Sequence, residues 1–198
     1  MMLLANRVLK RAAVLVASLL VLTGCASVKL PLENGRLTPA AGQGIAIVAF
    51  TAQSFSPDTA DAQLFIQGAN GRAVGYTRLV TDFIRAPGDT QNSVGRLLVL
   101  PLPAGQYAVT RAAGSWLRDS GTLIGNYQYV DVPLNAPFKV AAGEVVYLGQ
   151  VHLNMNLRGE VAFSQNSTRD FYDLQVRSGV TDTSNIQIRP LAATPAGQ

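Results

Sequence analysis

The side chains that could carry out catalysis are few, and a single histidine limits what they could form. His152 is the only histidine among the 198 residues, so one chain cannot build a metal site with two histidine ligands. A Ser-His-Asp device would have to use this residue, and the sequence contains no Gly-x-Ser-x-Gly elbow. Strand alternation through Glu144 to Leu153 predicts that His152 shares a face with Val146, Leu148 and Gln150. A structural histidine is the more common case there, and we expect no enzyme activity.

The carboxylates are spread along the chain and form no metal-ligand spacing. Asp170 and Asp173 could share one face of a helix, where we expect them to be solvated and to interact favourably with the helix N-terminus. The glycines of GANGRAVG, residues 68–75, fit no phosphate-loop spacing. We therefore expect no cofactor and no metal. The pair Asn70-Gly71 instead predicts a two-residue hairpin turn with Phe65 opposite Tyr76.

The single cysteine, Cys25, follows a short apolar segment. Residues 1–11 carry basic side chains at positions 7, 10 and 11 and no acidic residue, and residues 12–22 are apolar except for Ser18. A basic start, a short apolar run and small residues at the end are typical of a secretory signal peptide. The run is shorter than the roughly 20 apolar residues that a membrane-crossing helix needs.

The stretch Leu22-Thr23-Gly24-Cys25 resembles the lipobox of bacterial lipoproteins, although that family usually has Ala or Ser where Thr23 stands. The resemblance implies a signal peptide over residues 1–24 and lipid on Cys25, with a diacylglyceryl thioether and an acylated (palmitate-type) amine. Because Ala26 is not aspartate, it also implies anchoring in the outer membrane. An ordinary signal peptide with an unrelated cysteine is the alternative.

The net charge argues against nucleic acid as a partner. The chain has 16 basic and 12 acidic residues, a net charge of +4, but residues 1–24 hold three of the basic residues and none of the acidic ones. The remainder is close to neutral, and its arginines are scattered rather than clustered. Nucleic-acid binding requires a clustered basic surface, so we expect no nucleic-acid partner. The partners that we expect are the membrane, through the lipid that the lipobox resemblance implies, and a protein of the cell envelope.

The rest of the chain predicts an all-β fold. Short apolar segments such as Ile45 to Thr51 and Leu97 to Leu100 alternate with Gly/Pro turns, which is typical of an antiparallel β-sandwich, prealbumin-like or Ig-like. One short helix is expected near the C-terminus over Arg169 to Arg177, capped by Ser167 or Thr168 and ended by Gly179. The boundaries that we expect are a lipidated flexible tether at 25–43, the sandwich at 44–189 and a disordered tail at 190–198.

Two stretches carry a resemblance to a fold family. LPLPAGQYAVT, residues 100–110, resembles the Pro-x-Gly-x-Tyr turn and strand of small prealbumin-like domains, including carboxypeptidase-regulatory-like ones. FKVAAGEVVYLGQVHL, residues 138–153, resembles the late hairpin of bacterial lipoprotein domains of that shape. The resemblance implies a fold and no activity, because such sandwiches host many functions.

The best candidates for partner binding are aromatic. Trp116, the sole tryptophan, lies beside Arg118, and this combination can anchor a protein partner. Tyr127 and Tyr129 would share a strand face and could extend that surface. For Trp116 we favour packing into the core, because large aromatic side chains are usually mostly buried. For the two tyrosines, packing across the sheet is an equal alternative.

Three functions remain open at this stage. The first, which we favour, is a lipid-anchored, non-catalytic envelope module that binds a protein or organises the envelope. The second is binding of a glycan or small molecule in a loop cleft near Trp116. The third is a hydrolase built around His152, which would require a carboxylate and a serine beside the imidazole.

The lipobox resemblance predicts the behaviour of Cys25→Ser. This variant should not be lipidated, because the chain has no other thiol, and it should remain an unprocessed precursor or become soluble in the periplasm. Membrane fractionation combined with mass spectrometry of the N-terminus measures both outcomes. A variant still cleaved before residue 25 and retained in the outer membrane would contradict the lipoprotein hypothesis.

Overall fold

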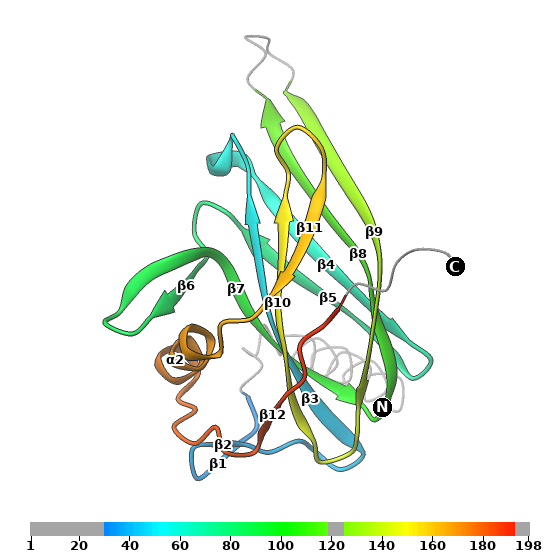
Figure 1. Ribbon diagram of the computed structural model, residues 1–198, viewed down its shortest axis with the longest axis vertical. Helices are drawn as coiled ribbons and strands as arrows, with labels where there is room; N and C mark the ends of the chain where they lie inside the picture. Colours follow the sequence, from blue (N-terminus) through cyan, green and yellow to red (C-terminus); the bar gives the residue numbers. More distant parts are fainter. Residues whose placement is uncertain (1–29, 119–124, 193–198) are drawn as a thin grey trace, which may run out of the picture. The chain divides into compact units, whose positions relative to one another are not determined.

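The computed structural model describes residues 30–118 and 125–192, and β-strands dominate them. The chain from Pro31 onward forms one compact unit, an all-β sandwich with one short helix near its C-terminus, as the sequence predicts (Figure 1). Within these residues, no helix combines the length and the apolar character needed to cross a membrane.

The first sheet is mixed and has β3 at its centre. The strand order is β11-β10-β3-β7-β6. Strand β12 pairs with the N-terminal part of β10, and β11 pairs with the C-terminal part of the same edge. Strand β3 is parallel to β10 and antiparallel to β7. The bounds are β3 Gln43–Gln53, β6 Phe83–Ala86, β7 Thr90–Pro103, β10 Val145–Asn154, β11 Glu160–Ser164 and β12 Ile186–Ile188.

The second sheet is antiparallel, with the order β5-β4-β8-β9. The bounds are β4 Asp61–Gly68, β5 Gly71–Arg78, β8 Gly105–Arg118 and β9 Asn126–Val140. A 3-10 turn, η2 (Pro57–Thr59), precedes β4. Val48 and Phe50 of β3 pack against Leu64 and Val109 of this sheet in the main core.

The opposite face of β3 is also buried. Ile45 and Ile47 are fully buried, yet they belong to the face that points away from the main core. The helix α2 (Ser167–Ser178) packs against β6 and β7 on this side. Leu174 of α2 is buried, and the Phe171 ring meets Tyr147 edge-on with centroids 5.2 Å apart. This second apolar layer explains why β3 is apolar along almost its whole length.

The ends of α2 follow local capping rules, with one difference from the sequence analysis. Asn166 is the N-cap, and its Oδ1 accepts a hydrogen bond from the Arg169 N–H at 3.1 Å. We expected Ser167 or Thr168 there, but the asparagine one residue earlier supplies the same acceptor. Gly179 ends the helix as predicted, in a left-handed conformation with φ 71°.

The ordered domain begins before residue 44. A small hairpin, β1 (Leu32–Glu33) with β2 (Arg36–Leu37), lies in the region where the sequence suggested a flexible tether. Leu37 is fully buried, its carbonyl accepts from Asn185 Nδ2 at 2.8 Å, and the Gly35 carbonyl accepts from the Thr181 N–H at 2.9 Å. These long-range contacts order a segment whose composition alone predicts a loop.

The β4–β5 hairpin has a different register from the predicted one. Gly68 pairs with Gly71, so the loop is Ala69-Asn70, and Phe65 lies opposite Val74 rather than Tyr76. A Cβ at Gly68 would lie 2.4 Å from the carbonyl oxygen of Gln106, and Asn70 Nδ2 donates to the Ala104 carbonyl at 2.8 Å. The register prediction was wrong because contacts with the β7–β8 turn, rather than the Asn-Gly preference, determine this loop.

A bulge in β10 changes the face of His152. The pairing of β10 with β3 shifts between Tyr147 and Gln150, and Gly149 has φ +79°. Val146 and Leu148 point into the main core, whereas Tyr147, Gln150 and His152 point to the α2 side. Simple alternation wrongly placed His152 with Val146 and Leu148, because one inserted residue reverses the faces.

The bulge predicts that Gly149→Ala is much more damaging than the matched change Gly143→Ala. Both glycines have positive φ, 79° and 76°, but a Cβ at Gly149 would lie 2.6 Å from the Ser164 carbonyl oxygen, whereas Gly143 has nothing within 4 Å. We expect losses of about 1 kcal/mol for Gly143→Ala from backbone strain and about 3 kcal/mol for Gly149→Ala from strain plus overpacking. Urea denaturation of both variants measures this, and equal losses would contradict the argument.

Candidate functional site

The two tyrosines expected at a binding surface lie together on the outer face of the second sheet. Tyr127 and Tyr129 of β9 are 56% and 76% exposed. Their ring centroids are 6.4 Å apart, with the rings tilted by 32°. Strand alternation produces this arrangement, because residues two apart on β9 project from the same face.

Trp116 does not belong to this tyrosine surface. It lies within β8, where it pairs with Gln128, and its side chain is partly buried against the main core. Tyr127 and Tyr129 pair with Leu117 and Ser115, the neighbours of Trp116 in β8. They therefore project from the opposite face of the sheet. Arg118 is exposed at the end of β8.

Two further residues of the same outer face, Phe65 and Arg111, were not predicted as site residues from the sequence. The Arg111 guanidinium lies 3.8 Å from the centroid of the Phe65 ring, and its Nη1 is 3.1 Å from a carboxylate oxygen of Asp131. Hollows of about 510 and 230 Å³ are both lined by this stack, one together with Val74 and the other together with Tyr129. Only the sheet order, β4 beside β8 and β8 beside β9, shows that these residues are neighbours.

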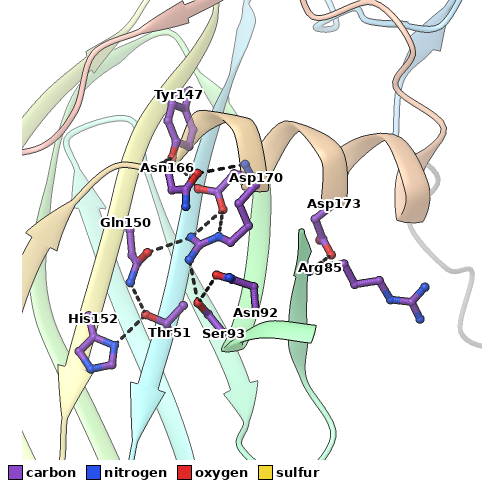
Figure 2. A network of polar contacts seen from close by, with 11 residues as sticks. Thr51, Arg85, Asn92, Ser93, Tyr147, Gln150, His152, Asn166, Asp170 and Asp173 are labelled. Atoms are coloured by element: carbon purple, nitrogen blue, oxygen red, sulfur yellow. Dashed lines mark hydrogen bonds and ion pairs between the residues drawn. The ribbon is translucent and has the colours of Figure 1, made fainter. Parts of the chain in front are cut away.

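A second group of polar residues surrounds His152 on the α2 side of the first sheet. Figure 2 shows a chain of hydrogen bonds that runs from Tyr147 to His152. The Tyr147 hydroxyl donates to Asp170 Oδ2 at 2.5 Å, and Arg169 Nε donates to the other carboxylate oxygen at 2.7 Å. Arg169 Nη2 also donates to Gln150 Oε1 at 2.9 Å. Asp170 and Asp173 are both buried, which corrects the solvated role expected for them.

The chain of hydrogen bonds continues from Gln150 through Thr51 to His152. Because Gln150 Oε1 accepts from Arg169, its Nε2 faces Thr51 and donates to Thr51 Oγ1 at 2.9 Å. The Thr51 hydroxyl hydrogen is then free for His152 Nδ1, at 2.9 Å. Nδ1 accepts this hydrogen when the imidazole carries its own hydrogen on Nε2. Thr51, Gln150 and His152 line an open hollow of about 420 Å³.

Burial controls the ionisation of this group. It lowers the pKa of His152 below its ordinary range, which keeps the imidazole neutral near pH 7. It also raises the pKa of Tyr147, and the hydrogen bond to Asp170 adds to that effect. For Asp170 burial raises the pKa, while the hydrogen bond from Tyr147 and the charge of Arg169 act in the opposite direction.

The network offers His152 little of what catalysis requires. Its bonded hydroxyl belongs to Thr51, a residue that is only 1% exposed. The nearest carboxylate in the chain of bonds, Asp170, is separated from His152 by Arg169, Gln150 and Thr51. Among the described residues, no three His, Cys, Asp or Glu side chains are grouped in a way that could hold a metal ion. The arrangement is suited to joining α2 to the sheet.

Comparison of the chain with protein-family models, curated proteins and solved structures gave no match.

The lowered pKa of His152 predicts a pH-dependent stability. The unfolded chain has the ordinary histidine pKa of about 6.5, and the folded value lies below it. Between these two values the unfolded state binds more protons, so stability is full above about pH 6.5 and falls as the pH drops through the folded pKa. His152→Gln should remove this part of the acid sensitivity, at a cost of about 1 kcal/mol from the altered hydrogen bond. Urea denaturation from pH 8 to 5 measures the difference, and identical pH profiles for both proteins would contradict it.

Proposed function

We propose that this protein is a lipid-anchored, non-catalytic module of the bacterial cell envelope that binds a protein partner through the outer face of the β5-β4-β8-β9 sheet. The observation that carries the proposal is the contrast between the two outer faces. Helix α2 packs on one face, against β6 and β7, whereas the other face exposes neighbouring tyrosines.

The composition of the exposed face supports a protein as the partner. Tyrosine and arginine are enriched where protein interfaces carry most of their binding energy. Here Tyr127 and Tyr129 lie in the same face as the Phe65–Arg111 stack. The face also carries two ion pairs, Arg111 with Asp131 and Arg78 with Asp61.

The anchor proposed at Cys25 would hold the module close to the membrane. Only residues 26–30 separate Cys25 from the compact unit that starts at Pro31, and an extended chain of this length spans about 20 Å. Several acyl chains would make the attachment stable, because each buried methylene contributes about 0.8 kcal/mol. By its resemblance to the lipobox, the sequence around Cys25 and Ala26 supports the outer membrane as the location.

Binding of a glycan or small molecule is the second candidate, at a different place from the loop cleft that the sequence suggested. The Trp116 ring packs against the core and lacks the exposure of a stacking platform. The hollow of about 510 Å³ beside Phe65 and Arg111 has both aromatic and polar walls, and it is the better position for such a ligand.

The double variant Tyr127→Ala/Tyr129→Ala tests the proposed face. We expect crosslinking in intact cells to give a protein adduct of defined mass with the wild type and at least about tenfold less with the double variant, as for loss of hot-spot residues. Its stability should change by no more than about 0.5 kcal/mol, because both rings are exposed.

Two variants serve as controls in this experiment. Phe55→Ala removes an equally exposed aromatic ring, 76%, from outside the sheet, and it should keep the adduct. Trp116→Ala should instead lose about 3 kcal/mol of stability, because it removes a core contact. An adduct unchanged in the double variant would refute the proposed face, and glycan binding lost in that variant would favour the second candidate.

A further inference from the structure

The first half of β9 is an open strand edge, and we infer that it binds an extended segment of the partner protein as an added strand. The inference rests on the proposed function, because it specifies how the partner is recognised. Strand β9 has 15 residues and is the last strand of its sheet, and among the described residues only β8 pairs with it.

The backbone groups of alternate β9 residues point to this open edge. Leu117 of β8 lies opposite Tyr127, but its N–H donates to Thr59 Oγ1 at 3.1 Å, and its carbonyl accepts from the same hydroxyl at 3.2 Å. These bonds lie on the β4 side of β8, so Leu117 and Tyr127 form a pair without mutual hydrogen bonds. Tyr127 therefore directs its own N–H and C=O away from β8, and by alternation Tyr129 and Asp131 do the same.

The second half of the same edge is protected, which makes the open half distinctive. Pro133 and Pro137 lie an even number of residues after Tyr127, so their backbone nitrogens face the same open edge. Proline has no N–H, so neither residue can donate a hydrogen bond to an added strand. Proteins commonly block exposed edges in this way to prevent strand addition. Residues 126–132 contain no proline and keep a free edge.

An apolar seam beside this edge provides the second independent observation. Val130 and Val132 of β9 and Val161 and Phe163 of β11 all point toward the main core but are only partly buried. The β10–β11 turn closes on β9 here, because a Cβ on Gly159 would lie 2.0 Å from the Val130 side chain. A strand added to β9 would cover this seam with alternate side chains and place the others beside Tyr127 and Tyr129. The expected ligand is thus a peptide of alternating apolar and polar residues.

The anchor geometry favours a partner's segment over a second copy of this chain. Two copies joined symmetrically through β9 would pair antiparallel. The β1–β2 hairpin and the start of β9 lie at opposite ends of the sandwich (Figure 1), so the two hairpins would lie at opposite ends of the pair. With links of about 20 Å, both anchors could reach one membrane only if a sheet face lay flat on it.

Segments of the same chain are also poor candidates for this edge. Residues 26–30 would be held by the lipid, and residues 193–198 read ATPAGQ, which contains a proline and no apolar alternation. A strand from another protein meets neither restriction.

The test compares Asp131→Pro with Asp131→Ala in the full chain, kept in detergent. Both variants lose the ion pair with Arg111, but only proline removes the N–H at the edge. The probes are peptides selected on the wild-type protein from a phage-displayed random library. We expect the selected peptides to alternate apolar and polar residues and to bind wild type and Asp131→Ala with the same affinity. Asp131→Pro should bind them at least about tenfold more weakly, because proline removes a main-chain hydrogen bond and blocks the edge.

The stability of the variants checks the register on which the inference depends. Asp131→Pro should keep the melting temperature of Asp131→Ala, because the N–H of residue 131 makes no bond to β8. Gln128→Pro should lower the melting temperature clearly, because that residue faces Trp116 in a bonded pair. A clear loss in Asp131→Pro, or none in Gln128→Pro, would overturn the assignment of the edge.

Four further outcomes would overturn the inference. The first is that the library yields no peptide of alternating apolar and polar residues, and the second is that the two Asp131 variants bind the peptides equally. The third is that the wild type sediments as a dimer that Asp131→Pro dissociates. The fourth is that deletion of residues 193–198 tightens peptide binding. The last two would identify a second copy or the chain's own tail as the occupant. If strand addition fails while the adduct still depends on Tyr127 and Tyr129, the proposed function stands with side-chain recognition alone.

Discussion

The burial of β3 on both of its faces is the constraint on which the rest of the structure depends. Val48 and Phe50 pack into the core between the sheets, while Ile45 and Ile47 require a second cover on the opposite side. Removing such side chains from water stabilises the fold by about 1.5–3 kcal/mol each, so an uncovered face would be costly. Helix α2, which packs against β6 and β7 on that side, supplies part of this cover. The outer face of the β5-β4-β8-β9 sheet has no such apolar requirement, which is why it can present tyrosines to a partner.

The polar network begins at the place where this second cover ends. Tyr147 still lies under α2, but Gln150 and His152 farther along the same strand border an open hollow. Arg169 and Asp170 are buried there as an ion pair, with the other polar atoms of both side chains bonded to Tyr147, Ser93 and Gln150. A buried pair is weak evidence for net stability, because desolvation offsets the attraction between the charges. Its directed bonds do specify one position for the start of the helix, and His152 lies at the other end of the chain of bonds.

The tyrosine surface and the open edge are two properties of the same alternate residues of β9. Tyr127 and Tyr129 project their rings from the outer face of the sheet and, by the same alternation, direct their backbone groups to the edge. A partner lying along β9 could therefore contact rings and main chain together. The prolines at positions 133 and 137 restrict that contact to the end of the sandwich far from the β1–β2 hairpin, and so far from the anchor that we propose.

The sequence by itself determined the features that depend on local forces: the all-β class, the positions of the main apolar strand segments, the helix with its stop at Gly179, and the placement of Tyr127 and Tyr129 on one face of a strand. Periodicity and capping report such features because the responsible contacts lie within a few residues. Only the tertiary structure decided the β4–β5 register, the reversal of His152 by the bulge at Gly149 and the burial of Trp116. It also decided the pairing of Phe65 with Arg111 and the open edge of β9. Each of these depends on which strands become neighbours, and contacts between residues far apart in the chain determine that order.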